Sequence, residues 1–246
     1  MSNKKTRKNN KKHKKINIIF DIDETLIQAY NNEGGVLTSF DRGDYAIGKL
    51  DSGREYLIYK RPYLEKLMNF CYEYFYVSFW TSGKKDHCST VLKNILTEKQ
   101  FKKTKIILAR SDQNEFYEFK SDKYYMINLH NNTIAKPLDY LWDHPDFSDT
   151  FNRNNTVIVD DNPLNVAINQ HNSIFIYPWC RFDKRDRKLK ELIKLLKKYK
   201  YATNIRDIKA FHLHIPRTLS ITNVLAHKCG FPLSKRETKK IISKFN

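Results

Sequence analysis

Residues 16–26 read Ile-Asn-Ile-Ile-Phe-Asp-Ile-Asp-Glu-Thr-Leu, so a short apolar run gives way abruptly to a run that carries three carboxylates. The apolar run Ile16–Phe20 is typical of a buried strand. Asp21 and Asp23 follow it directly. In an open parallel sheet, ligands bind outside the carboxyl ends of the strands. The stretch therefore predicts a central strand that presents two carboxylates to a binding site.

Outward from this stretch, short apolar runs alternate with segments of helical spacing. Strands are predicted at 75–80, 105–109, 156–159 and 173–176, and amphipathic helices at 61–72, 88–96 and 189–196. This alternation predicts an α/β fold, a Rossmann-like parallel sheet with helices on both faces. Residues 28–60 are rich in Gly, Asn and Asp, which predicts a small β-hairpin flap. Residues 110–132 lack a helical period and are expected to form an insertion.

Three of the predicted strands end in polar residues, namely Asp21 and Asp23, Thr81, and Asp160 and Asp161. We expect these groups to converge at one edge of the sheet. Two carboxylates at close range repel by about 4 kcal/mol at an effective dielectric near 20. A hard divalent cation relieves this repulsion, and all-oxygen ligands favour Mg²⁺ over zinc. Asp21 can then act as a nucleophile and Asp23 can exchange a proton with the leaving group, which predicts phosphoryl transfer through an aspartyl-phosphate.

At these residues the sequence resembles the haloacid-dehalogenase superfamily, and within it the FCP/SCP-type (NLI-interacting-factor-like) phosphatases of the RNA polymerase II C-terminal domain. Residues 21–26 look like the D-L-D-E-T-L signature of that family, with Ile in place of Leu. Arg61-Pro62 resembles the R-P stretch before its second motif, and Thr81 resembles the second motif itself. Asp160-Asp161 matches its closing acidic pair. The resemblance covers residues 16–199 and implies a HAD-like fold without a large cap domain.

The resemblance also implies residues that bind the substrate phosphate. Thr81 and Lys136 resemble the threonine and lysine that hold the non-bridging oxygens, and Arg110 resembles a substrate-binding arginine. Two alternatives stay open at this point. Lys120 or Lys123 could take the place of Lys136, and Thr81 could simply cap the helix that follows it.

By the same resemblance, Mg²⁺ is held by an Asp21 carboxylate oxygen, the Asp23 main-chain carbonyl and Asp161, with Asp160 in support. The implied substrate is a phosphoserine or phosphothreonine in an extended peptide, such as an RNA polymerase C-terminal-domain-like peptide. An open site without a cap agrees with a macromolecular substrate. Two rival hypotheses are a phosphatase of nucleic-acid ends and a non-catalytic scaffold on the same fold.

The positive charge of the chain is concentrated at its two ends. Of the 246 residues, 45 are Lys or Arg and 27 are Asp or Glu, a formal charge of +18. Residues 1–15 hold eight basic and no acidic residues, and 201–246 hold nine basic and two acidic ones, so residues 16–200 carry only +3. We expect a disordered basic tail over 1–15, a phosphatase domain over 16–200 and a basic, helical extension over 201–246. The ends fit arms that bind nucleic acid or an acidic partner, an import signal or solubilising tails.

Composition also bears on location. The four cysteines are widely spaced without a C-x-x-C pair, which indicates reduced thiols rather than disulfides or a zinc site. No apolar run approaches eighteen residues, and no apolar region follows the basic start. We therefore expect an intracellular protein, in the nucleus or the cytoplasm, that does not span a membrane.

Deleting residues 1–15 should weaken binding of RNA, DNA or an acidic protein, because it removes eight basic residues. The binding that this tail contributes in the full chain should fall steeply as the salt concentration rises, since each phosphate contact releases counterions. Hydrolysis of a small aryl phosphate should not change. Fluorescence polarisation with a labelled oligonucleotide over a salt series measures the effect. Equal binding by the truncated and full chains at low salt would identify the tail as a solubility or import segment.

Overall fold

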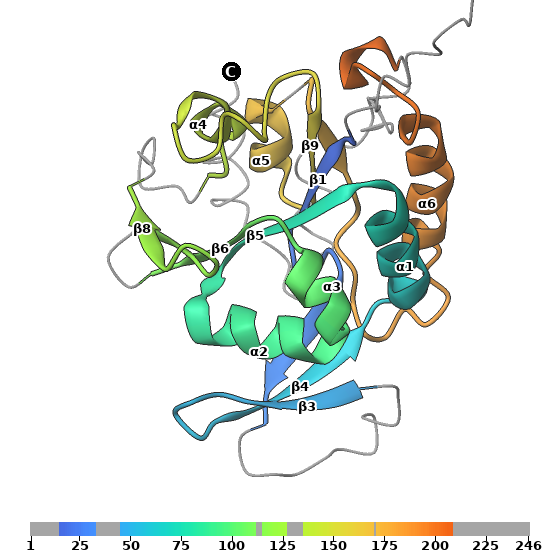
Figure 1. The fold of residues 1–246 in the computed structure, drawn as a ribbon. Helices are drawn as coiled ribbons and strands as arrows, with labels where there is room; N and C mark the ends of the chain where they lie inside the picture. Colours follow the sequence, from blue (N-terminus) through green and yellow to red (C-terminus); the bar gives the residue numbers. More distant parts are fainter. Residues whose placement is uncertain (1–14, 33–44, 112–114, 127–134, 170, 209–246) are drawn as a thin grey trace, which may run out of the picture.

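A computed structural model describes residues 15–32, 45–111, 115–126, 135–169 and 171–208. It contains a seven-stranded sheet with the order β10-β9-β1-β5-β6-β7-β8 and a separate three-stranded sheet with the order β2-β4-β3 (Figure 1). The strands are β1 (Asn17–Phe20), β2 (Ile27–Asn31), β3 (Tyr45–Lys49), β4 (Glu55–Lys60), β5 (Tyr76–Lys84), β6 (Ile107–Arg110), β7 (Phe116–Glu118), β8 (Lys123–Tyr125), β9 (Thr156–Asp160) and β10 (Ser173–Phe175). The helices are α1 (Leu64–Tyr74), α2 (Lys85–Ile95), α3 (Glu98–Lys103), α4 (Leu138–Asp143), α5 (Pro163–Ile168) and α6 (Lys188–Tyr199), followed by a 3₁₀ turn (Ile205–Asp207).

The central strand β1 lies between β9 and β5 and runs parallel to both. Phe20 pairs with Val159 on one side and Phe79 on the other. The residues that follow these positions therefore lie side by side at the same edge of the sheet. The α/β fold with five neighbouring parallel strands is confirmed, and it places the predicted acidic motifs side by side.

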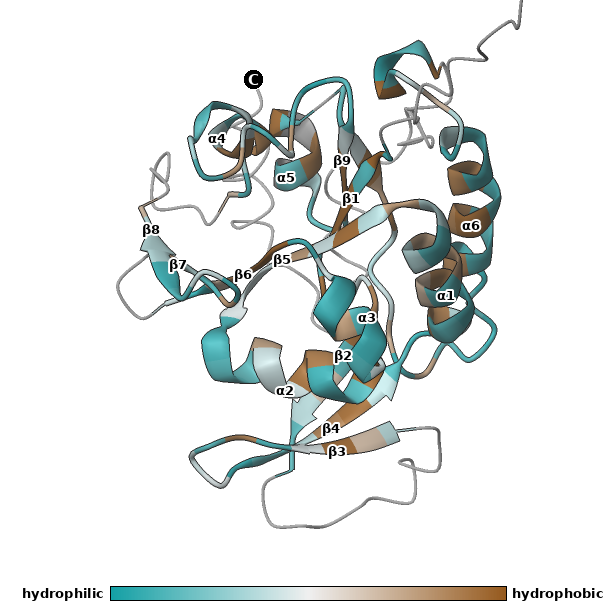
Figure 2. Cartoon of the chain, viewed as in Figure 1, coloured by the Kyte–Doolittle hydropathy of each residue, from teal (hydrophilic) through white to brown (hydrophobic). Residues whose placement is uncertain are grey.

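Helices cover both faces of this sheet, as the sequence predicted. The alternation of a strand sends Ile18 and Phe20 to one face and Ile19 to the other. The first two pack in one apolar core with residues of α1, α2 and α6, while Ile19 packs with Leu138 and Leu141 of α4. Figure 2 shows the amphipathic character of α6, whose outer face is hydrophilic.

The segment after β6 extends the sheet, where the sequence predicted only an irregular insertion. Strand β7 runs antiparallel to β6, and β8 runs antiparallel to β7. The large sheet is therefore mixed rather than wholly parallel. These two strands have three residues each, too few for a periodic signal to emerge from sequence.

The flap predicted over residues 28–60 is the three-stranded antiparallel sheet, in which β4 pairs with both β2 and β3. Residues 33–44 of this segment lie outside the described residues, as do the basic tail over 1–14 and residues 209–246 of the C-terminal extension. Among the residues that the structure describes, no helix combines the length and the apolar character needed to cross a membrane.

The side chain of Arg61 joins three segments that are distant in sequence. It is 1% exposed, and its Nε and Nη2 atoms each donate to a carboxylate oxygen of Asp186 at 3.0 Å. Nη1 donates to the carbonyl oxygens of Glu24 and Thr25 at 3.3 and 3.0 Å, and Nη2 also donates to that of Tyr177 at 2.9 Å. Arg61 thus ties the acidic loop after β1 to the segment before α6.

Arg61→Met should lower the free energy of unfolding by about 3–5 kcal/mol, because it leaves the buried Asp186 carboxylate without its cation. Denaturation in urea measures the loss. Arg54→Met, a control at an exposed position, should change the stability little. A loss below about 1 kcal/mol in the Arg61 variant would mean that this buried pair does not hold the segments together.

Candidate active site

Two aspartates and one lysine form a buried ion cluster at the carboxyl edge of the sheet. Asp21 directly follows β1, and Asp160 is the last residue of β9. The Lys136 ammonium donates to Asp21 Oδ1 and, at 2.8 Å, to Asp160 Oδ2. The three residues are 6%, 0% and 1% exposed. The structure thus brings together three side chains that the sequence places 24 or more residues apart.

Burial shifts the proton equilibria of this cluster. Desolvation raises the pKa of the Asp21 carboxyl to about 7, while the Lys136 ammonium opposes that rise. Burial alone would lower the pKa of Lys136, but the charges of Asp160 and Asp21 outweigh it and raise that pKa above its usual range. Lys136 therefore remains a cation at neutral pH and stabilises the charged form of Asp21.

Two asparagines position the segment that carries Lys136. Asn165, on α5, accepts a hydrogen bond from the Lys136 backbone N–H at 3.1 Å and donates to Asp160 Oδ2 at 3.0 Å. Asn169 donates to the Lys136 carbonyl oxygen at 2.8 Å and accepts from the Leu138 N–H at 2.9 Å. Both asparagine side chains are buried. The lysine is therefore held by its backbone as well as by its ion pairs.

The acidic cluster fits a hard divalent cation. Asp21, Asp160 and Asp161 each offer one carboxylate oxygen, and these atoms lie within 4.8 Å of one another. Asp160 already accepts from Lys136, Asn165 and, at 2.8 Å, the backbone N–H of residue 162. These bonds favour a supporting role for Asp160 in cation binding. Asp21 and Asp161 are then the better ligands for the cation. An all-oxygen donor set of this kind suits Mg²⁺.

Asp23 lies on the open side of the cluster, with a side chain that is 39% exposed. Its Oδ2 atom accepts a hydrogen bond from Thr81 Oγ1 at 3.3 Å. Thr81 Oγ1 in turn accepts from the Gly83 backbone N–H at 2.9 Å. The predicted convergence of Thr81 with the first acidic motif is thus observed. The alternative that Thr81 caps the following helix is wrong, because α2 begins at Lys85 after the N-cap residue Lys84, and no side chain caps it.

His87, on α2, binds the other oxygen of the same carboxylate. Its Nε2 atom lies 2.8 Å from Asp23 Oδ1. Burial alone would lower the pKa of His87, but the hydrogen bond and charge of Asp23 raise it overall. The ring of Tyr56, from β4, packs edge-on against the imidazole with 5.4 Å between ring centroids. The three-stranded sheet thereby contacts the side chain of Asp23 through this histidine.

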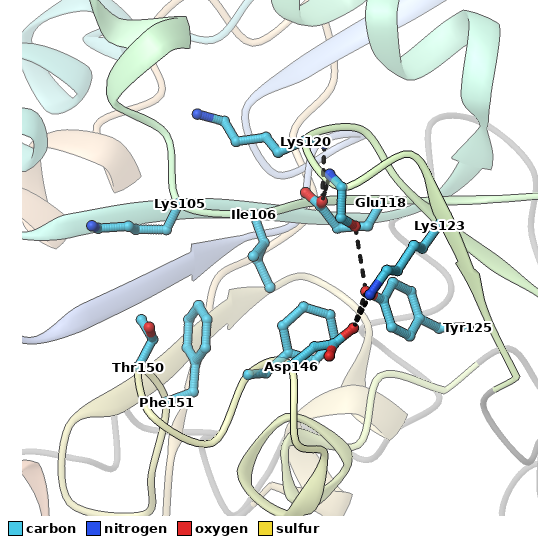
Figure 3. Close-up of a pocket in the computed structure, with 11 residues that line it drawn as sticks. Lys105, Ile106, Glu118, Lys120, Lys123, Tyr125, Asp146, Thr150 and Phe151 are labelled. Atoms are coloured by element: carbon cyan, nitrogen blue, oxygen red, sulfur yellow. Dashed lines mark hydrogen bonds and ion pairs between the residues drawn. The ribbon is translucent and has the colours of Figure 1, made fainter.

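The remaining candidates lie in different places. Arg110 is the last residue of β6 and pairs in register with Lys84, so it lies at the same edge of the sheet. Its buried Nε atom has no hydrogen-bond partner in the described part of the chain. Lys120 and Lys123 line a separate cavity of about 380 Å³ (Figure 3). Lys123 pairs there with Asp146 at 2.9 Å, so neither lysine takes the position of Lys136.

Sequence reasoning missed His87, Asn165, Asn169 and the buried role of Arg61. His87 falls inside a helical pattern, where a single histidine gives no signal of its partner. The asparagines are spaced four residues apart, which places them on one side of a helical turn. That spacing was the one available signal, but it does not identify the segment that the side chains bind.

Comparison with known proteins supports the resemblance seen in the sequence. A family model described as NLI interacting factor-like phosphatase matches residues 16–208. "Ubiquitin-like domain-containing CTD phosphatase 1" of Xenopus laevis is 25% identical over 229 residues, which cover 82% of this chain and 68% of the relative. "Nuclear envelope morphology protein 1" of Saccharomyces cerevisiae is 23% identical over 212 residues, which cover 80% of this chain and 42% of the relative.

Among solved structures, the chain is similar to one described as "The Structure of Fcp1, an essential RNA polymerase II CTD phosphatase". The TM-score is 0.47 at 19% sequence identity, and the match covers 77% of this chain. It covers 52% of the other chain, so this chain spans about half the length of that relative.

Adding Mg²⁺ to the full chain should stabilise it against thermal unfolding, because the cation binds the acidic cluster in the folded state. The gain is about 2.7 kcal/mol when the free ion is 100 times its Kd. Asp161→Ala should weaken Mg²⁺ binding roughly tenfold or more. Calorimetric titration measures the affinity, with the exposed Asp51→Ala as a control that binds Mg²⁺ normally. Equal affinity in the Asp161 variant would remove this residue from the ligand set.

Proposed function

Because the chain belongs to the NLI interacting factor-like phosphatase family, we propose that it is a Mg²⁺-dependent phosphoprotein phosphatase that acts through an aspartyl-phosphate. One observation carries the proposal. The Asp21 carboxylate is buried beside the Lys136 ammonium and within reach of Asp160 and Asp161, at the edge of the sheet where substrates bind in parallel α/β folds.

In the first step, an oxygen of the Asp21 carboxylate attacks phosphorus and forms a new P–O bond. The bond from phosphorus to the leaving oxygen breaks, and its electron pair stays on that oxygen. Asp23 gives its proton to the same oxygen, so the leaving group departs as an alcohol. The contact of Asp23 with Thr81 and that of Asp21 with Lys136 support this division of roles.

In the second step, Asp23 accepts a proton from a water molecule as the water oxygen attacks the aspartyl-phosphate. The bond between phosphorus and Asp21 breaks, which releases phosphate and restores the carboxylate. Thr81, Lys136 and Arg110 hold the non-bridging oxygens, where positioning and electrostatics supply most of the rate enhancement.

The side chains of Asp21 and Asp161 and the main-chain carbonyl of Asp23 would hold Mg²⁺, with Asp160 in support. The bound cation supplies positive charge that offsets the repulsion between the carboxylates and the phosphate. The contributions of this chain are to bury the donors together and to keep the Lys136 ammonium opposite them.

The proposed substrate is a phosphoserine or phosphothreonine in an extended peptide, of the kind found in an RNA polymerase C-terminal domain. The name of the relative from Xenopus laevis, a CTD phosphatase, supports this class. The rival hypotheses were a phosphatase of nucleic-acid ends and a scaffold without catalysis. The presence of all four aspartates favours catalysis over the scaffold.

Asp21→Asn should lower kcat on a phosphoserine peptide on the order of 10³-fold or more, because an amide cannot form the acyl-phosphate. Asp146→Asn is the matched control: this aspartate is paired with a lysine in the cavity of Figure 3, and its loss should leave kcat unchanged. Release of inorganic phosphate with and without EDTA measures turnover and its dependence on Mg²⁺.

The same assay separates the alternatives. Wild-type protein that hydrolyses 3′- or 5′-phosphorylated oligonucleotides and not phosphopeptides would support the nucleic-acid hypothesis. Absence of turnover on every phosphate ester would favour the scaffold. Full activity in a folded Asp21→Asn protein would contradict the assignment of the nucleophile.

A further inference from the structure

The carboxylate of Asp23 is held at both of its oxygen atoms by residues from the end of β5 and the start of α2. His87 Nε2 lies 2.8 Å from Oδ1, and Thr81 Oγ1 lies 3.3 Å from Oδ2. The two oxygens therefore have different surroundings, an imidazole at one and the hydroxyl of the proposed phosphate-binding threonine at the other.

The imidazole itself is fixed from the opposite side. The Tyr56 ring packs edge-on against it, and the His87 side chain is only 15% exposed. An Nε2–H group can donate to Oδ1 whether Asp23 is ionised or carries its proton on Oδ2. The Asp23 side chain remains 39% exposed, so the anchored carboxylate is still accessible from the open side of the cluster.

The absence of a side chain at Gly83 makes this arrangement possible. A Cβ atom at this position would lie 3.0 Å from His87 Cδ2, 3.2 Å from Thr81 Oγ1 and 3.3 Å from Asp23 Oδ2. These separations are tighter than ordinary van der Waals contact, so the added atom would push the three groups apart. Histidine, aspartate and threonine are thus packed as one unit around a glycine.

We infer that His87 is a positioning residue that anchors Asp23 through Oδ1 and so presents Oδ2, beside Thr81, as the oxygen that exchanges the proton with the leaving group. This inference rests on the proposed function and assigns a task to a residue that the mechanism above does not use. His87 touches neither phosphorus nor the leaving oxygen. It acts by restricting the orientation of the acid.

Removal of the anchor should therefore affect only reactions that need the acid. His87→Leu should lower kcat on phenyl phosphate, a poor leaving group, by roughly tenfold to a hundredfold, the scale of a misplaced catalytic group. The same variant should retain kcat on 4-nitrophenyl phosphate within about threefold, because a good leaving group needs little protonation. KM for both substrates should stay near the wild-type value, since phosphate binding is intact.

Two further variants separate positioning from a general structural effect. His87→Gln offers an amide N–H in place of Nε2–H and should restore much of the rate on phenyl phosphate. Gly83→Ala keeps the imidazole but crowds His87, Asp23 and the phosphate-binding Thr81 together, so it should lower the rate on both esters. His144→Leu removes an imidazole that packs against Tyr125 instead of Asp23. This control should leave kcat on both esters unchanged.

The outcomes distinguish this inference from the proposed function. No wild-type turnover of either ester would overturn the proposed function and this inference with it. If wild-type turnover is normal and is lost in Asp23→Asn, equal losses on both esters in His87→Leu would overturn the positioning role alone. Unchanged rates in His87→Leu would overturn it as well.

Discussion

The Lys136 ammonium lies between the carboxylates of Asp21 and Asp160 at the centre of the carboxyl edge of the sheet. Without this cation, the parallel pairing of β1 and β9 would place two buried negative charges side by side. A buried charge that loses its partner destabilises a protein strongly. The lysine therefore permits the strand arrangement as well as the chemistry. Asn165 of α5 and Asn169, just after this helix, bind the lysine backbone and fix the position of that charge.

The topology explains how one edge collects groups from distant parts of the chain. Because β1 is flanked by β9 and β5, the carboxyl ends of all three strands lie together, and these ends carry the acidic pairs and Thr81. Arg61 donates to the carbonyl groups of the loop after β1 through the same guanidinium that pairs with Asp186. The loop that carries Asp23 is therefore supported from outside the sheet, and its acidic side chain can remain on the open side.

Much of this arrangement could be predicted from sequence because it follows from local signals. Apolar runs that end in Asp21 or Asp160 identify strands and the edge at which they terminate. No comparable signal in the sequence indicates which residues a given side chain will contact. Lys120, Lys123 and Lys136 look alike in sequence, and only the folded chain shows that Lys123 pairs with Asp146 while Lys136 enters the acidic cluster. The strands β7 and β8 escaped detection because three residues each are too few to give a periodic signal.

The two sides of the site differ in burial, and this difference corresponds to two tasks in the proposed mechanism. Asp21, Lys136 and Asp160 are buried and mutually bound, which suits recognition of a phosphoryl group common to all substrates. The Asp23 side chain is partly exposed and reaches the three-stranded sheet through the imidazole that packs on Tyr56, while its backbone pairs with Ile27 of β2. In the proposed mechanism the leaving group, which varies among substrates, meets this second side. The mechanism thus assigns the variable part of the substrate to the exposed side of the site and the invariant phosphoryl group to the buried ion cluster.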